Sequence, residues 1–274
     1  MTFGDRLHAA VADRGPLCAG IDPHAALLGA WGLGDDVAGL ESFALGATEA
    51  IAPHVAVVKP QSAFFERFGS RGVAVLERVV ATAREAGALV LLDVKRGDIG
   101  STSQAYADAY LDPASPLAAD AITASPYLGF GSLTPMVETA RRHGAGLFVL
   151  ALTSNPEGPE VQHATAPSGR TVAGTVLDHL GALNEGATTL GSYGAVVGAT
   201  VGETGESFDI GGPLLAPGYG AQGGTVDDLR RVFGGAVGRV LPSTSRDLLR
   251  LGPDPVALRD GALRIADDLA GLAG

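Results

Sequence analysis

The 274-residue sequence predicts a single-domain α/β protein, a TIM (β/α)8 barrel that spans residues 1–274. Eight short apolar segments of strand type alternate with segments of helical type, as eight βα units in about 250 residues require. The strand-type segments are apolar on both faces, as buried parallel strands are. No linker or internal repeat divides the chain. The competing architecture, a doubly wound open sheet, usually carries a glycine fingerprint after its first strand, but Asp22-Pro23-His24 stands there.

The strand predictions rest on apolar runs that end in polar or turn-forming residues. The expected strands are 17–21, 55–59, 89–95, 119–123, 146–152, 195–199, 213–216 and 239–241. The helix predictions rest on apolar residues three or four positions apart, such as Leu76 and Val80. The expected helices are 3–13, 40–52, 71–86, 103–110, 133–143, 171–184, 226–233 and 255–272. We expect Ser101 or Thr102 to cap the fourth of these helices, and residues 157–170 to form a surface loop.

Composition limits the classes of function. The net charge of −11 argues against nucleic acid or an anionic membrane as a partner, because both favour a basic protein face. Cys18 is the only cysteine, so neither a disulfide framework nor a cysteine-based metal site is expected within one chain. The sequence shows no signal peptide and no apolar run of membrane-spanning length. We therefore expect a cytoplasmic protein that acts on a small molecule.

Alternating charges follow the third expected strand. Asp93 and Lys95 are two positions apart, so they point to the same face of a strand, and Asp98 follows Gly97 in the next turn. Lys95 and Lys59 are the only lysines among 19 basic residues, and both end apolar strands. A desolvated lysine can release a proton near neutral pH, whereas arginine cannot. These four charged residues are therefore candidate catalytic groups, and a purely structural ion-pair network is the competing interpretation.

Two loops near the end of the sequence predict a phosphate site. The glycine-rich residues 217–224 follow the seventh strand, and Ser243-Thr244-Ser245-Arg246 follows the eighth. Barrels often bind phosphate with these two loops and a nearby helix N-terminus. Glycines let backbone N–H groups approach a phosphate, and Arg246 can bind it with two hydrogen bonds.

A metal ion is the rival use of Asp22, Asp93 and Asp98, because three carboxylates could hold Mg²⁺. The amines of Lys59 and Lys95 would compete for the same oxygens. The six histidines show no close pair of the kind that binds zinc. We therefore predict no metal.

The motif Asp93-x-Lys95-x-x-Asp98-Ile99-x-x-Thr102 resembles the signature of the orotidine 5′-phosphate decarboxylase family. Further segments are similar to the family in the same order along the chain: Gly20-Ile21-Asp22-Pro23, Val58-Lys59-Pro60-Gln61, Ser125-Pro126-Tyr127, Ala216-Pro217-Gly218 with Gln222, and Ser245-Arg246. The chain length and the stretch 153–158 resemble the longer bacterial branch of the family, type 2.

The resemblance implies a cofactor-free barrel enzyme that converts orotidine 5′-phosphate to UMP and carbon dioxide as a homodimer. It implies that Lys59, Asp93 and Lys95 surround the scissile carboxylate, with Lys95 donating a proton to C6. Asp98 and Thr102 would come from the second subunit. The implied substrate ligands are Asp22 and Thr102 for the ribose hydroxyls, Ser125 for the pyrimidine ring, and Gln222 with Arg246, beside Ser245, for the phosphate.

Three alternatives remain open from the residues. A Schiff-base aldolase on the same barrel would use Lys95 as its nucleophile. A Mg²⁺-dependent sugar-phosphate decarboxylase would share the Asp-x-Lys strand end. A phosphate-binding barrel without catalytic activity would bind ligand and would not need Lys95.

Overall fold

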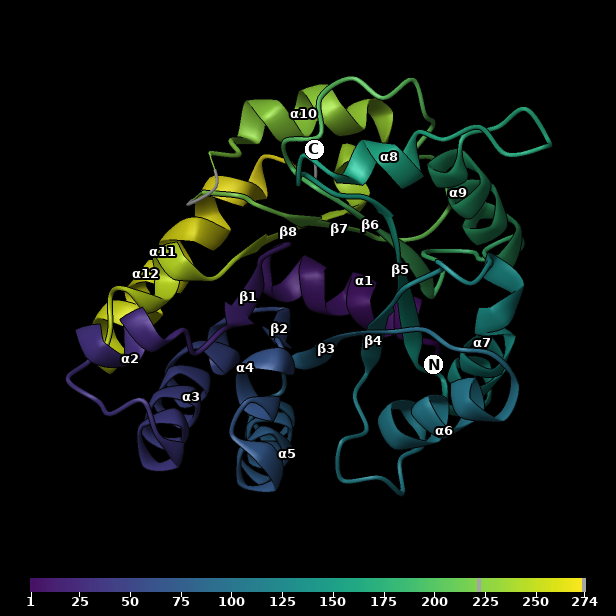
Figure 1. Ribbon diagram of the computed structural model, residues 1–274. Coiled ribbons are helices and arrows are strands. Elements are labelled where there is room, and N and C mark those ends of the chain that lie inside the picture. The colour runs from purple at the N-terminus through teal and green to yellow at the C-terminus, as the bar shows by residue number, and fades with distance from the viewer. Residues whose placement is uncertain (221–222, 273–274) are drawn as a thin grey trace.

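The computed structural model describes residues 1–220 and 223–272 and confirms the predicted barrel. Eight parallel strands close in chain order, and helices surround them (Figure 1). Pairing of Cys18 in the first strand with Ser243 in the last completes the ring. The strands are β1 (Cys18–Ile21), β2 (Val57–Pro60), β3 (Leu89–Arg96), β4 (Ala121–Ala124), β5 (Gly146–Leu152), β6 (Tyr193–Val197), β7 (Leu214–Pro217) and β8 (Val240–Thr244).

The long helices lie where the apolar periodicity predicts them. The α-helices are α1 (Phe3–Arg14), α2 (Ala25–Ala30), α3 (Val37–Ile51), α4 (Ala63–Glu66), α5 (Gly69–Glu85), α6 (Gly100–Leu111), α7 (Thr134–His143), α8 (Gly158–Gln162), α9 (Val172–Leu183), α10 (Val226–Phe233), α11 (Arg246–Leu249) and α12 (Pro255–Ala270). In the described residues, short 3₁₀ segments accompany them: η1 (Ala52–His54), η2 (Phe130–Leu133) and η3 (Gly234–Arg239).

Two local expectations are wrong. Residues 157–170, expected as a loop, contain α8, a five-residue helix with a proline in its first turn. Helix α6 begins at Gly100, so Ser101 and Thr102 lie in its first turn and do not cap it. The N-cap position is occupied by Ile99, whose side chain forms no capping hydrogen bond. Only residues 97–99 separate the end of β3 from the start of α6, so the turn is shorter than a cap at Ser101 or Thr102 would require.

Helix α1 closes the amino end of the barrel. Its residues Phe3 and Leu7 pack in one cluster with barrel-interior residues such as Leu91 and Phe148. The rings of Phe3 and Phe148 meet edge to face with centroids 6.0 Å apart. Gly146 at the start of β5 permits this approach, because a Cβ there would lie 2.3 Å from the Phe3 ring. The carboxyl end of the barrel is therefore the end available for a binding site.

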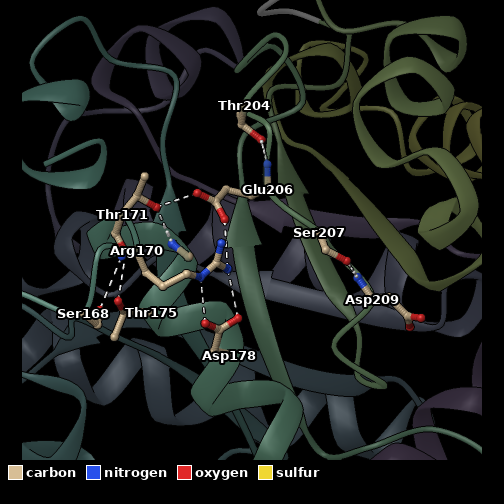
Figure 2. Close-up of polar contacts among 10 residues, drawn as sticks. Ser168, Arg170, Thr171, Thr175, Asp178, Thr204, Glu206, Ser207 and Asp209 are labelled. Carbon is tan, nitrogen blue, oxygen red and sulfur yellow. Dashed lines mark hydrogen bonds and ion pairs between the residues drawn. The ribbon is translucent and has the colours of Figure 1, made fainter. Parts of the chain in front are cut away.

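An ion pair ties residues 198–213, which connect β6 to β7, to Arg170, just before helix α9 (Figure 2). The buried carboxylate of Glu206 lies 3.2 Å from the guanidinium of Arg170 and accepts a 2.6 Å hydrogen bond from the hydroxyl of Thr171. Arg170 also donates two hydrogen bonds to Asp178 of α9. Gly174 leaves room for the carboxylate, since a Cβ there would lie 2.6 Å from it. These contacts hold two irregular segments near the barrel mouth in one arrangement.

We expect Glu206→Ala to lower the free energy of unfolding by about 2 kcal/mol, because Arg170 and Thr171 lose a buried acceptor. The side chain of Arg170 is 43% exposed, so water replaces part of its interactions and limits the loss. Urea unfolding curves measure the change. Arg259→Ala is the matched control, because it removes an exposed ion pair with Asp260 and should cost less than about 0.5 kcal/mol. Equal losses in the two variants would contradict the role given to Glu206.

Candidate active site

A cavity of about 460 Å³ opens at the carboxyl ends of the barrel strands. Enzymes with this fold carry their catalytic groups at this end. Six residues predicted from the sequence line the cavity: Asp22, Lys59, Asp93, Lys95, Ser245 and Arg246. They come from the ends of β1, β2, β3 and β8 and from the residues that follow, so the closed barrel brings together side chains far apart in the sequence.

Two amines share one buried carboxylate in this cavity. Nζ of Lys59 lies 3.3 Å from Oδ2 of Asp93, and Nζ of Lys95 lies 2.6 Å from Oδ1 of the same residue. The side chains of Lys59 and Asp93 are 6% and 7% exposed, whereas that of Lys95 is 44% exposed. We call Lys59, Asp93 and Lys95 the charged array. Lys95 is therefore the member of this array that a bound molecule reaches most easily.

Opposite charges decide the ionisation of the array. Burial by itself raises the pKa of Asp93, but Lys59 and Lys95, together with hydrogen bonds from Lys95 and Thr123, lower that pKa to about 2. Burial by itself lowers the pKa of Lys59, but the carboxylates of Asp22 and Asp93 more than offset it and hold the pKa above the ordinary lysine value. Asp93 and Lys59 are therefore both charged near neutral pH.

Three polar atoms at the ends of β1 and β8 are buried without a hydrogen-bond partner in the described part of the chain: Oδ1 of Asp22, Oγ1 of Thr244 and Oγ of Ser245. Such atoms are rare in folded proteins, and in a cavity they indicate where polar groups of a ligand bind. Gly20 allows them to approach one another, because a Cβ there would lie 2.7 Å from Cβ of Ser245. Asp22 can accept hydrogen bonds from hydroxyl groups, and the two hydroxyls can donate to an anion.

Three predicted site residues within the described part of the chain do not line this cavity: Asp98, Thr102 and Ser125. Asp98 lies between β3 and α6, and Thr102 lies on the exposed first turn of α6. Ser125, just after β4, lines a neighbouring cavity of about 520 Å³ that shares Leu150 with the first. Gln222 lies outside the residues that the structure describes.

Sequence reasoning missed two contributions to the site. The hydroxyl of Thr123 donates a 2.7 Å hydrogen bond to Oδ1 of Asp93 and accepts a 2.9 Å hydrogen bond from the backbone N–H of Lys95. The only signal for it was a polar side chain at the last position of the expected strand 119–123. The ring of His24 packs on Phe64 with centroids 4.2 Å apart at the cavity wall, and no pattern in the sequence pairs these two residues.

Within residues 1–220 and 223–272, no group of three His, Cys, Asp or Glu side chains is arranged to hold a metal ion. The oxygens of Asp93 are already engaged by the amines of Lys59 and Lys95. In the same part of the chain, no helix has the length and apolar character needed to cross a membrane.

Comparison with known sequences shows similarity along almost the whole chain. The profile of the orotidine 5′-phosphate decarboxylase / HUMPS family matches residues 15–256. A curated orotidine 5′-phosphate decarboxylase from Nocardioides sp. is 73% identical over 270 residues, which cover 97% of this chain and 98% of the relative. The enzyme of that name from Streptomyces coelicolor is 63% identical over 269 residues, covering 97% and 96% of the two chains.

Comparison with solved structures agrees. A crystal structure from Streptomyces avermitilis, assigned as an orotidine 5′-phosphate decarboxylase, matches with a TM-score of 0.97 and 64% identity over 99% of this chain and 96% of that chain. The OMP decarboxylase of Leishmania donovani matches with a TM-score of 0.73 and 30% identity over 100% of this chain and 99% of that chain. The likeness therefore covers the complete barrel and not only the short motifs.

Proposed function

Since this chain belongs to the orotidine 5′-phosphate decarboxylase / HUMPS family and decarboxylates orotidine 5′-phosphate to UMP and carbon dioxide, we propose that Lys59, Asp93 and Lys95 perform the reaction without a cofactor. The observation that supports this proposal is the single buried carboxylate held between two amines in the cavity. Lys95, the exposed amine, is the proton donor, and Lys59 keeps Asp93 ionised and in place.

Electrostatics supplies the chemistry. Breaking the bond from C6 to the carboxylate leaves an electron pair on C6 that the pyrimidine ring delocalises poorly. In the bound substrate, Asp93 would repel the carboxylate by about 4 kcal/mol at ~4 Å and an effective dielectric constant near 20. This repulsion is relieved as neutral carbon dioxide leaves. The Lys95 ammonium group stays beside C6 and stabilises the electron pair. It then gives up one N–H proton to form the new C6–H bond and is left as a neutral amine.

Substrate contacts remote from C6 hold the carboxylate against this repulsion. We assign Asp22 to the ribose hydroxyls, because its buried Oδ1 lacks a donor in the described part of the chain. Ser245 and Arg246 are assigned to the phosphate, with Gln222 from the loop after β7. Arg246 lies at the cavity wall and at the start of α11, so its guanidinium can form paired hydrogen bonds to phosphate oxygens. Ser125 is assigned to the pyrimidine ring.

The absorbance assay that tests this function follows the loss of orotidylate ultraviolet absorbance when purified protein is added. We expect full activity in the presence of EDTA, because no step of the mechanism needs a metal ion. Loss of activity on chelation, restored by Mg²⁺, would support the metal-dependent sugar-phosphate alternative instead. Borohydride treatment with a carbonyl substrate should leave Lys95 unmodified, whereas a Schiff-base enzyme would be labelled there.

We propose that the active unit is a cytoplasmic homodimer with shared sites. Asp98 and Thr102 do not line the cavity of their own chain, and the family resemblance assigns them to the site of a second subunit. Ile99, Tyr127 and Leu128 are exposed apolar side chains in the turns after β3 and β4. Their burial against a second copy would favour association. Asp98 would then complete the charged array, and Thr102 would contact the ribose.

Mixed dimers of two inactive variants test the shared site. Mixing Asp93→Ala with Asp98→Ala subunits should restore about a quarter of wild-type activity, because half of the randomly formed dimers are hybrids and each hybrid has one intact site. The assay is turnover after unfolding and joint refolding of the two variants. Asp93→Ala mixed with Lys95→Ala is the control, since both changes lie on the same side of one site and cannot complement. Equal activity in the two mixtures would exclude shared sites.

A further inference from the structure

We propose that Thr123 is a positioning residue of the active site, whose hydroxyl group links the carboxylate of Asp93 to the backbone of Lys95 and thereby holds the Lys95 amine for proton transfer. This inference rests on the proposed role of Lys95. Thr123 acts through these two residues and does not itself exchange a proton with the substrate.

The pairing of β3 with β4 creates the need for this hydroxyl. The two strands pair regularly up to Leu92 and again at Arg96, with a shift of register between them. Residues 93–95 of β3 therefore lie opposite a single residue of β4, Thr123. A bulge of this kind leaves backbone groups without a partner in the strand ladder. The Thr123 hydroxyl accepts the Lys95 N–H at 2.9 Å and so supplies the acceptor that the ladder no longer offers.

The backbone of Lys95 is held in an unusual conformation. Its φ of 44° is the single positive φ of a non-glycine residue in the described part of the chain. Residues with a side chain rarely adopt this conformation, and it persists where surrounding contacts impose it. Strain of this type is concentrated at functional sites, and here it falls on the residue assigned as the proton donor.

Three contacts close a ring around Lys95. The hydroxyl of Thr123 donates to Oδ1 of Asp93 at 2.7 Å, and the amine of Lys95 contacts the same oxygen at 2.6 Å. The backbone N–H of Lys95 donates a hydrogen bond to the Thr123 hydroxyl, which completes the ring. A hydroxyl has one proton to donate and lone pairs to accept, so a single threonine satisfies both contacts. The ring restricts the long Lys95 side chain at both ends, which keeps its amine near the reacting carbon.

Replacing Thr123 by valine, which has nearly the same shape but no hydroxyl group, tests the proposal. We expect Thr123→Val to lower kcat by about a hundredfold, the cost of a catalytic group displaced by about 1 Å. The KM for orotidine 5′-phosphate and the dissociation constant of UMP should stay within about threefold, because Thr123 is not assigned to substrate binding. Thr123→Ser keeps the hydroxyl and should retain kcat within about threefold of wild type. If the valine variant does not fold, Thr123→Ala removes the hydroxyl without added bulk.

Thr48→Val is the matched control for loss of a buried threonine hydroxyl. Oγ1 of Thr48 donates a 2.7 Å hydrogen bond to the Ala44 carbonyl inside α3, away from the cavity. We expect this variant to be less stable than wild type but to keep its kcat. A similar fall of kcat in Thr48→Val and Thr123→Val would overturn the positioning role, since it would trace both losses to stability. The positioning role would also be overturned if folded Thr123→Val or Thr123→Ala kept the wild-type kcat. It would equally be overturned if Thr123→Ser lost as much kcat as Thr123→Val.

Amide hydrogen exchange at Lys95 gives a readout that does not depend on turnover. Exchange should be faster in Thr123→Val than in wild type and near wild type in Thr123→Ser, because the hydroxyl is the acceptor of this N–H. Unchanged exchange in Thr123→Val would contradict the inference. A different variant tests the proposed function, which would be contradicted if Lys95→Ala retained turnover. An inactive Lys95→Ala together with a fully active Thr123→Val would overturn the inference alone.

Discussion

Lys95→Ala is expected to lower kcat for orotidine 5′-phosphate by about 10⁵-fold, because one side chain supplies both proton donation, worth about 10²–10⁴, and stabilisation of the charge at C6, worth about 10²–10³. The protein should still fold. Asp93 keeps its contacts with Lys59 and Thr123 in the variant, and the Lys95 side chain is 44% exposed, so its truncation opens no buried cavity. UMP, which lacks the carboxylate, should still bind.

Single-turnover loss of substrate absorbance measures the effect of Lys95→Ala. Lys95→Arg is the matched control, because arginine keeps the positive charge but does not release a proton near neutral pH. We expect the arginine variant to lie between alanine and wild type, which separates the charge of Lys95 from its proton. Turnover in Lys95→Ala within about tenfold of wild type would show that another group donates the proton.

The sequence was sufficient to predict the barrel and the charged side chains that meet at the carboxyl end of its strands. Strands that are buried on both faces are nearly uniform runs of apolar residues, so charges at their ends stand out, as Lys59 and Asp93 do. Asp93 and Lys95 were expected on one face of their strand, and the structure places the Lys95 amine on the Asp93 carboxylate. The closed barrel then brings the end of β2 beside the end of β3.

Other features depend on contacts that no local pattern records. Thr123 acquires its two hydrogen bonds from a shift of register between β3 and β4, and pairing register is not visible in either strand alone. Helix α8 has five residues, which is too short for a periodic pattern to show. Asp98 does not line the cavity of its own chain, and the sequence points to a role in a second subunit's site only through the family resemblance.

Replacement of Asp93 is expected to have the second large effect, and it separates repulsion from simple structural support. Asp93→Asn should lower kcat by about a thousandfold, because a repulsion of about 4 kcal/mol is no longer relieved in the transition state. It should also lower the free energy of unfolding by about 3 kcal/mol, since the buried Lys59 loses its nearest carboxylate. Urea unfolding of the variant measures that cost.

Binding in an inactive background tests the repulsion directly. Lys95→Ala turns over too slowly to consume the substrate, so its dissociation constant for orotidine 5′-phosphate can be measured at equilibrium. Adding Asp93→Asn should tighten that binding by at least about tenfold, because the substrate carboxylate no longer meets a negative charge and Lys59 becomes free to attract it. Affinity for UMP should change little, since UMP carries no carboxylate at C6. Unchanged or weaker binding of orotidine 5′-phosphate by the folded double variant would exclude repulsion by Asp93 as a source of the rate.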